Sequence, residues 1–280
     1  MVIVNGEKCR SIDVSDRGFQ YGDGLFETIE VNNGKPVFFD RHWRRLQAGC
    51  ERLFIPCPPV QLLAREIHAL IEDAARAVLK INITRGSGGR GYGQPEMVHP
   101  TRVLSLHPFP DYPDTYRSQG IKARFCQLRL GVNPLLAGLK HMNRLEQVLA
   151  RREWQDPAIQ EGLLLDLHEH VIEGTMSNLF IIRDAVLVTP LLDSSGVAGI
   201  IREIILEAAE QFNLTARQQH LSRQDILEAD EAFVTNSIIG LWPIKHIAGR
   251  DIPVGPHAQK ISRWLDAYKQ QCDETTAVAK

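Results

Sequence analysis

The stretch Val171-Ile-Glu173-Gly-Thr-Met-Ser177-Asn178-Leu-Phe180 places one carboxylate at the end of an apolar run. Valine and isoleucine favour a β-strand, so we expect Glu173 at a strand end. An ionised carboxylate is costly there unless a proton or a cation meets it. These residues alone leave two interpretations open. Glu173 either serves a protonated ligand, such as a pyridinium nitrogen, or forms an ordinary salt bridge at a sheet edge.

A lysine follows an apolar loop in Leu135-Leu-Ala-Gly-Leu-Lys140-His-Met-Asn143, just before a predicted helix over about Asn143–Trp154. A desolvated lysine loses proton affinity and becomes an amine nucleophile for an aldehyde. The alternative is a surface lysine beside a helix start, since buried lysines are rare.

Two further features could bind an anion. Gly196-Val-Ala-Gly199-Ile200-Ile201 leads directly into a predicted helix, whose free N–H groups and positive dipole end attract phosphate. Arg45 could add a bidentate cation. The simpler interpretations are a glycine-containing helix start and an arginine on a solvated helix face.

Composition limits the classes of protein. The chain has 280 residues, 44% of them hydrophobic, with a formal net charge of −2 and a pI near 6.6. These values indicate no basic field for nucleic acid and no membrane partner. The apolar runs are too short to span a bilayer, and the start lacks the pattern of a signal peptide. Five scattered cysteines without CxxC spacing favour reduced thiols in the cytoplasm and predict no metal site.

The periodicities predict two domains of the α+β and α/β class. Three prolines in His107–Pro113 mark the boundary, which gives an N-terminal α/β domain (1–112), a linker (113–119) and a larger C-terminal domain (120–280). The expected strands include Phe26–Val31, the alternating Leu79–Ile83 and Arg102–Leu106. The expected helices include Arg41–Leu53, Val60–Arg76 and one from Ile200. We also expect hairpins that turn at His168–His170 and at Arg183-Asp184.

Taken together, these motifs resemble the fold-type IV enzymes, which depend on pyridoxal 5′-phosphate (PLP). The signature of that family is present at Glu173, Thr175, Asn178-Leu-Phe180, Leu187-Val-Thr189 and Val197-Ala-Gly199-Ile-Ile-Arg202. The resemblance runs almost end to end. It implies a two-domain fold with a smaller N-terminal α/β domain and a larger, β-barrel-like C-terminal domain with helices. It also implies a homodimer.

The resemblance assigns the cofactor site. Lys140 would form the Schiff base and move protons, and Glu173 would face the pyridine nitrogen. Arg45, the backbone of Ile200 and Ile201 and the hydroxyl of Ser237 would hold the phosphate. The motif residues Ser177 and Asn178 complete the predicted cofactor site.

Within the family, the chain is most similar to the aminodeoxychorismate lyases. The residues that carry this similarity are the run Leu136–Gln147, the glycine-rich run Arg85–Tyr92 and Thr28. It implies conversion of 4-amino-4-deoxychorismate to 4-aminobenzoate and pyruvate, with Lys140 as the base and Lys140 or a water held by Thr28 as the acid. Arg90, Tyr92, Phe26 and Thr28 would contact the substrate. The alternatives are a D-amino-acid or branched-chain amino-acid aminotransferase and a non-catalytic PLP-binding protein.

Overall fold

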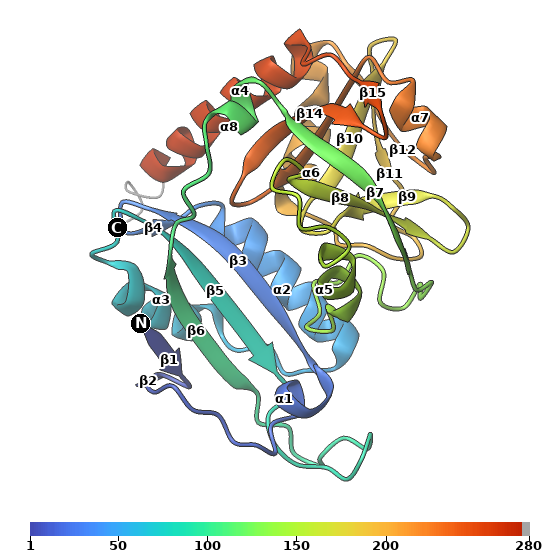
Figure 1. Cartoon of the computed structure of the whole chain (residues 1–280). Helices are drawn as coiled ribbons and strands as arrows, with labels where there is room; N and C mark the ends of the chain where they lie inside the picture. Colours follow the sequence, from blue (N-terminus) through green and yellow to red (C-terminus); the bar gives the residue numbers. More distant parts are fainter. Residues whose placement is uncertain (276–280) are drawn as a thin grey trace. The chain divides into compact units, whose positions relative to one another are not determined.

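The computed structural model describes the backbone of residues 1–275 and the side chains of residues 1–271 (Figure 1). The chain forms two compact units. The first comprises Met1–Pro110, Lys140–Asn143 and the described chain from Lys269, and the second comprises Asp111–Leu139 and Arg144–Tyr268. The domains expected from sequence were continuous, whereas the first unit also takes in the four residues that begin with Lys140.

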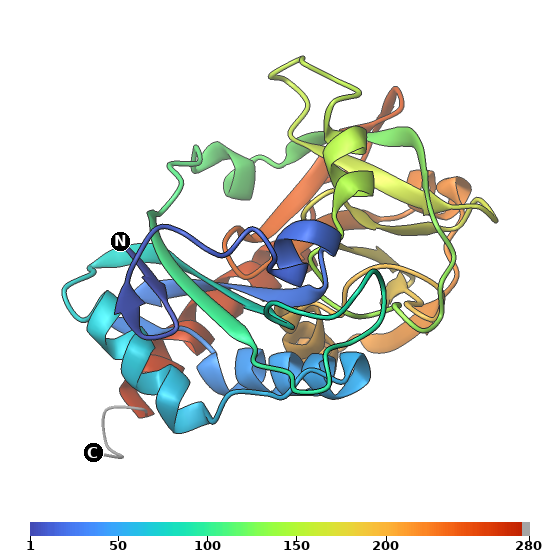
Figure 2. The ribbon, with the colours of Figure 1, turned by 90° about the horizontal axis from the view of Figure 1, so that it is seen from below.

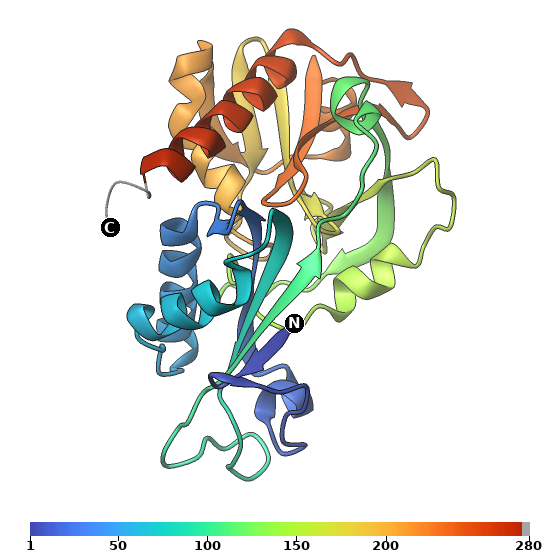
Figure 3. The same cartoon turned by 90° about the vertical axis from the view of Figure 1, so that its left-hand side faces the viewer.

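The first unit is built on an antiparallel sheet of order β2-β1-β6-β5-β3-β4. Its strands are β1 (Val2–Val4), β2 (Glu7–Lys8), β3 (Gly24–Asn32), β4 (Lys35–Pro36), β5 (Arg76–Thr84) and β6 (Thr101–Pro108). Helices α2 (Phe39–Leu53) and α3 (Val60–Ile71) cover one face of this sheet (Figures 2 and 3). Leu79, Ile81 and Ile83 are buried against these helices, which confirms the predicted alternation. The short helix α1 (Arg17–Tyr21) precedes β3.

Two predicted boundaries in this unit are wrong. The helix from Val60 ends at Ile71, not at Arg76, because Ala74 and Ala75 accept hydrogen bonds from the Asn33-Gly34 turn. The proline-rich stretch was predicted to be irregular from His107, yet β6 continues through Pro108. Pro108 is tolerated there because β1 pairs only with the earlier residues of β6. On the edge of β6 that faces β1, no partner strand therefore needs a hydrogen bond from the N–H that proline lacks.

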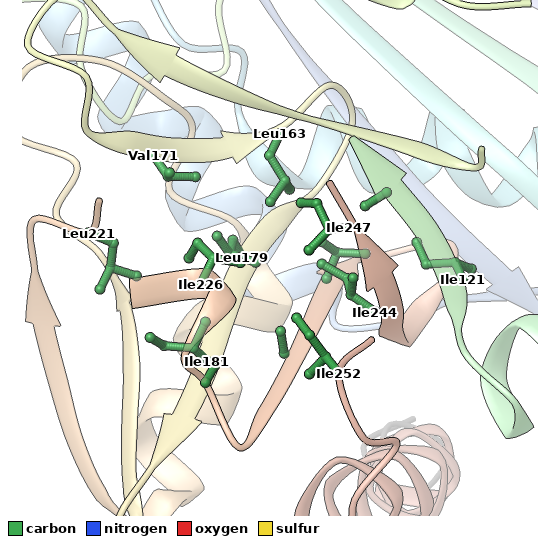
Figure 4. Close-up of a cluster of buried hydrophobic side chains, with 14 of the residues drawn as sticks. Ile121, Leu163, Val171, Leu179, Ile181, Leu221, Ile226, Ile244, Ile247 and Ile252 are labelled. Atoms are coloured by element: carbon green, nitrogen blue, oxygen red, sulfur yellow. The ribbon is translucent and has the colours of Figure 1, made fainter. Parts of the chain in front are cut away.

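The second unit is a mixed sheet of order β12-β11-β10-β13-β14-β7-β8-β9, with β15 beside β14. Its strands are β7 (Ile121–Leu130), β8 (Glu161–Asp166), β9 (Val171–Gly174), β10 (Asn178–Arg183), β11 (Val186–Pro190), β12 (Thr215–Gln219), β13 (Glu231–Asn236), β14 (Gly240–Ile247) and β15 (Arg250–Asp251). Both predicted hairpins are present, as β8–β9 and β10–β11. A bridge between Val171 and Leu221 links the β9 end of the sheet to the chain just after β12. The sheet therefore curls into the expected barrel-like form around a mostly aliphatic core (Figure 4).

Helices surround this sheet. They are α4 (Thr115–Ser118), α5 (Leu145–Arg151), α6 (Ile200–Ala208), the 3-10 turn η1 (Ala209–Phe212), α7 (Arg223–Leu227) and α8 (Pro256–Thr275). The predicted helix start at Ile200 is confirmed. The helix predicted from Asn143 to Trp154 is shorter and spans Leu145–Arg151. Asn143 lies before it, and its side-chain amide donates to the Gly22 carbonyl (3.0 Å).

Candidate active site

Lys140 lies in an extended segment that adds to the beginning of β3. The Phe26 N–H donates to the Lys140 carbonyl (3.0 Å), and the Met142 N–H donates to the Gly24 carbonyl (2.9 Å). The half-buried Lys140 amine lies 4.1 Å from the centre of the Phe26 ring. The face of an aromatic ring attracts a cation. Two residues predicted for the site are thus in contact.

Thr28 lies on the same face of β3 as Phe26, because side chains two apart in a strand point the same way. Its partner across the ladder is Lys80, whose amine lies 5.3 Å from the Phe26 ring centre. The face that carries the Lys140 amine therefore also carries a hydroxyl and a second amine.

On the opposite, helix-covered face of β3, Glu27 is buried among aliphatic side chains. Arg45 of α2 donates to its carboxylate through Nε (2.8 Å) and Nη2 (2.5 Å), and His42 Nδ1 lies 2.6 Å from Oε2. An ionised carboxylate only accepts hydrogen bonds, so the neutral His42 carries its proton on Nδ1. The Arg45 guanidinium is thus held in a fixed orientation.

Two ionisable side chains of this cluster, Glu27 and His42, have shifted pKa values. Burial alone would raise the pKa of Glu27, but the charge of Arg45 and the hydrogen bonds from His42 and Arg45 outweigh it and lower this pKa to about 2. Burial lowers the pKa of His42 below 6.5, although Glu27 opposes the shift. Both groups therefore keep one protonation state at neutral pH, with Glu27 charged and His42 neutral.

Sequence reasoning selected Arg45 but missed its partners. Two signals could have found them. Glu27 interrupts the apolar positions Leu25 and Ile29 on the buried face, and His42 lies one helical turn before Arg45. A charge on a buried strand face requires a partner from the covering helix.

In the second unit, Glu173 is 4% exposed in β9. The Val197 N–H donates to its Oε2 (2.8 Å), and Gln147 Nε2 lies 3.4 Å from Oε1. Burial lowers the pKa of Arg144, and the charge of Glu173 opposes that shift. The predicted buried carboxylate is therefore supported by a backbone donor and by a nearby guanidinium charge.

The N-terminus of α6 combines several features of an anion site. Its N-cap is Gly199, which provides no side-chain cap for the N–H groups of the first turn. Asn178 Nδ2 donates to the Val197 carbonyl (2.8 Å), and a Cβ on Gly199 would lie 1.9 Å from Asn178 Oδ1. Thr235 is the direct cross-strand partner of Asn178, so both side chains share a face. The Thr235 hydroxyl is buried without a hydrogen-bond partner, which leaves a donor for a ligand at this side of the sheet.

Two predicted cofactor residues lie in turns with polar partners. The Ser177 hydroxyl donates to Glu161 (2.7 Å), a fully buried carboxylate that also accepts from Thr175. Ser237 lies in the turn between β13 and β14, which Asn236 shapes by accepting the N–H groups of the two isoleucines that follow Ser237. These contacts hold both turns in place, and the cofactor roles of the two serines stay predictions.

Arg90 and Tyr92 lie in the loop between β5 and β6, and both are exposed. Tyr92, 88% exposed, packs on Tyr21 with ring centres 5.5 Å apart. Among the described residues, neither Arg90 nor Tyr92 has a hydrogen bond or ring contact with Lys140 or Phe26. Their substrate role stays a prediction.

The described residues contain no helix long and apolar enough to cross a membrane. Within the same part of the chain, no group of three or more histidine, cysteine, aspartate or glutamate side chains could hold a metal ion.

A model of the family described as Amino-transferase class IV matches residues 24–247, from the first residue of β3 to the last of β14. The chain belongs to this family. The match spans Lys140, Glu173 and the start of α6, which carry the geometry described above. It confirms the resemblance inferred from the motifs.

Class IV relatives agree with this chain over nearly its whole length. It is 36% identical to the aminodeoxychorismate lyase of Vibrio harveyi over 266 residues, 93% of this chain and 98% of that protein. It is 30% identical to a putative branched-chain-amino-acid aminotransferase of Methanocaldococcus jannaschii, over 88% of this chain and 86% of that protein. The crystal structure of 4-amino-4-deoxychorismate lyase from Pseudomonas aeruginosa superposes with a TM-score of 0.92 at 43% identity, over 95% of this chain and 98% of that one. The fold is therefore the expected fold-type IV fold.

Proposed function

We propose that this class IV protein is an aminodeoxychorismate lyase, which converts 4-amino-4-deoxychorismate to 4-aminobenzoate and pyruvate in folate biosynthesis. The agreement with two lyases at 36% and 43% identity, each over more than nine-tenths of this chain, carries the proposal. The aminotransferase relative matches at lower identity over a smaller share of the chain.

We propose PLP as the cofactor, because the described residues fit its three reactive parts. The amine of Lys140 would react with the aldehyde of PLP. The buried carboxylate of Glu173 would face its ring nitrogen. The N–H groups at the uncapped start of α6 would bind its phosphate. Arg45, Ser177, Asn178, Ile200, Ile201 and Ser237 are the further residues that we propose to hold it. When bound, PLP supplies an electron sink for the carbon that loses a proton.

The chain's own residues would move the protons. Lys140 would remove the C4 proton of the substrate, and its amine lies over the Phe26 ring, 4.1 Å from the ring centre. Release of pyruvate needs an acid at the leaving oxygen, which Lys140 or a water held by Thr28 supplies. Thr28 shares a strand face with Phe26, so its hydroxyl lies on the side of β3 that carries the amine. Arg90 and Tyr92 would bind a substrate carboxylate.

We also propose a cytoplasmic homodimer. Helix α5 supports the dimer, because it exposes an apolar stripe at helical spacing: Leu145 is 75% exposed, Val148 54% and Leu149 57%. Such a stripe is typical of a surface that another protein covers.

The test is an absorbance spectrum of the purified protein followed by turnover of enzymatically generated 4-amino-4-deoxychorismate. Lys140→Ala should abolish the absorption of lysine-bound PLP and the release of 4-aminobenzoate and pyruvate. Lys80→Ala is the matched control, because its amine approaches the same ring from the neighbouring strand. It should keep the spectrum.

Each other outcome has a distinct meaning. Amino transfer from D-alanine or leucine to 2-oxoglutarate, without 4-aminobenzoate, would make the protein an aminotransferase. No absorption band after PLP is added would exclude the proposed cofactor and the chemistry built on it.

A further inference from the structure

Arg17, the first residue of α1, is an almost fully buried arginine whose side chain is 6% exposed. Its Nε donates to Asp23 (2.9 Å). Its Nη1 donates to the carbonyls of Gly91 (3.0 Å) and Gly93 (3.1 Å), and its Nη2 lies 3.5 Å from the Tyr92 carbonyl. One guanidinium therefore binds three consecutive carbonyls of a loop more than seventy positions away in the sequence.

The loop has few hydrogen bonds among its own residues. Four glycines of the loop have positive φ: Gly86, Gly88, Gly89 and Gly91. Glycine adopts this conformation without steric strain, but it loses more conformational entropy than other residues when it is held in one conformation. The short 85–93 segment has one hydrogen bond of its own near the tip, from the Gly93 N–H to the Arg90 carbonyl (3.1 Å). Helix α1 and this loop lie at the same end of the first sheet (Figures 1 and 3).

Aromatic contacts reinforce the arrangement. The Arg17 guanidinium lies 5.0 Å from the centre of the Tyr21 ring, and Tyr21 in turn packs on Tyr92. The carbonyls that Arg17 binds begin at the residue directly after Arg90. Arg17 therefore holds the loop backbone immediately after Arg90.

We propose that Arg17 is a positioning residue that fixes Arg90 for the carboxylate of the substrate, an inference that rests on the proposed function. Lysine cannot replace it, because one ammonium cannot reach Asp23 and three carbonyls in the planar pattern of a guanidinium. In this role Arg17 touches neither substrate nor cofactor. It acts through the position of Arg90, so its loss should weaken the binding of the substrate.

Arg85 provides a matched control. The Arg85 guanidinium also donates to Asp23, to both of its carboxylate oxygens (2.8 and 3.0 Å). Its other hydrogen bonds go to the carbonyls of Leu53 and Phe54 and not to the loop tip. Arg17→Lys and Arg85→Lys therefore both change the pairing with Asp23, and only the first releases Gly91–Gly93.

The experiment compares the steady-state kinetics of the PLP-loaded wild type, Arg17→Lys, Arg17→Gln and Arg85→Lys. Both Arg17 variants should raise KM about tenfold or more, since several charge-assisted hydrogen bonds that order the loop are lost. Their kcat should change less than about threefold and the cofactor spectrum should stay unchanged. An unchanged KM, or an equal rise in Arg85→Lys, would overturn the proposal.

A second readout does not need turnover. Trypsin should cut after Arg90 about tenfold faster in Arg17→Gln than in the wild type or Arg85→Lys, because the loop is no longer held. If the wild type lacks lyase activity but this difference appears, the proposed function fails while the anchoring of the loop stands. Equal cutting rates in all three proteins would refute the anchoring itself.

Discussion

Replacing Glu27 by glutamine removes the negative charge that His42 and Arg45 share, with almost no change in shape. The magnitude follows from the pKa of Glu27, which falls from its ordinary 4.5 to about 2 in the folded protein. A difference of that size corresponds to about 3 kcal/mol of preference for the ionised side chain. Because Glu27 is fully buried, solvent screening does not reduce this figure. We therefore expect Glu27→Gln to lower the free energy of unfolding by about 3 kcal/mol at pH 7.

The pH dependence sharpens this prediction. A carboxyl group whose pKa is lowered by folding contributes stability above its unfolded pKa and loses it as the pH falls towards the folded pKa. The difference between wild type and variant should therefore shrink between pH 4.5 and pH 2, and should be about 1 kcal/mol at pH 3.

Urea unfolding followed by circular dichroism at pH 7 and pH 3 measures both differences. Glu72→Gln is the control, because Glu72 is 57% exposed and lies 3.7 Å from His68, so its loss should change stability by less than about 0.5 kcal/mol. A Glu27→Gln protein as stable as the wild type at pH 7, or a difference that does not depend on pH, would refute the reasoning.

Three other perturbations test other parts of the molecule. Gly199→Ala would bring a methyl group to 1.9 Å from Asn178 Oδ1, so PLP affinity measured by equilibrium dialysis should fall at least tenfold; unchanged affinity would argue against the anion site at α6. Leu145→Lys places a charge in the apolar stripe of α5, and light scattering should then show a shift from dimer to monomer, whereas a wild type that is already a monomer would exclude the dimer. A hydrogen bond from Cys50 lowers the pKa of Cys57, while burial raises the pKa of Cys126 to about 12. Mass spectrometry should therefore find iodoacetamide on Cys57 well before Cys126. The reverse order would contradict this difference in thiol reactivity.

Local patterns in the sequence predicted much of the fold. The alternation of Leu79, Ile81 and Ile83 gave β5, and the glycines before Ile200 gave the start of α6. Both signals depend on residues that are neighbours in the chain, so one sequence is enough to detect them.

Contacts between distant residues were not predictable in the same way. Strand β12 is exposed along its whole length and has no apolar alternation; it is a strand because it pairs with β11. The pairing of Lys140 with Phe26 likewise depends on a hydrogen bond across most of the N-terminal half of the chain. The motifs selected Lys140 and Arg45 as candidates, whereas Glu27 and His42 became visible only once α2 lay on β3.

The addition of Lys140–Asn143 to β3 has a consequence for synthesis on the ribosome. The backbone groups of Gly24 and Phe26 that bind this segment have no such partner until the chain has been made as far as Met142. An unpaired strand edge is a site of aggregation, so the nascent first unit carries this exposed edge throughout the synthesis of β5, β6 and β7. A fragment that stops at Pro110 would keep it permanently. Such a fragment should associate with itself or with a chaperone that recognises open strands.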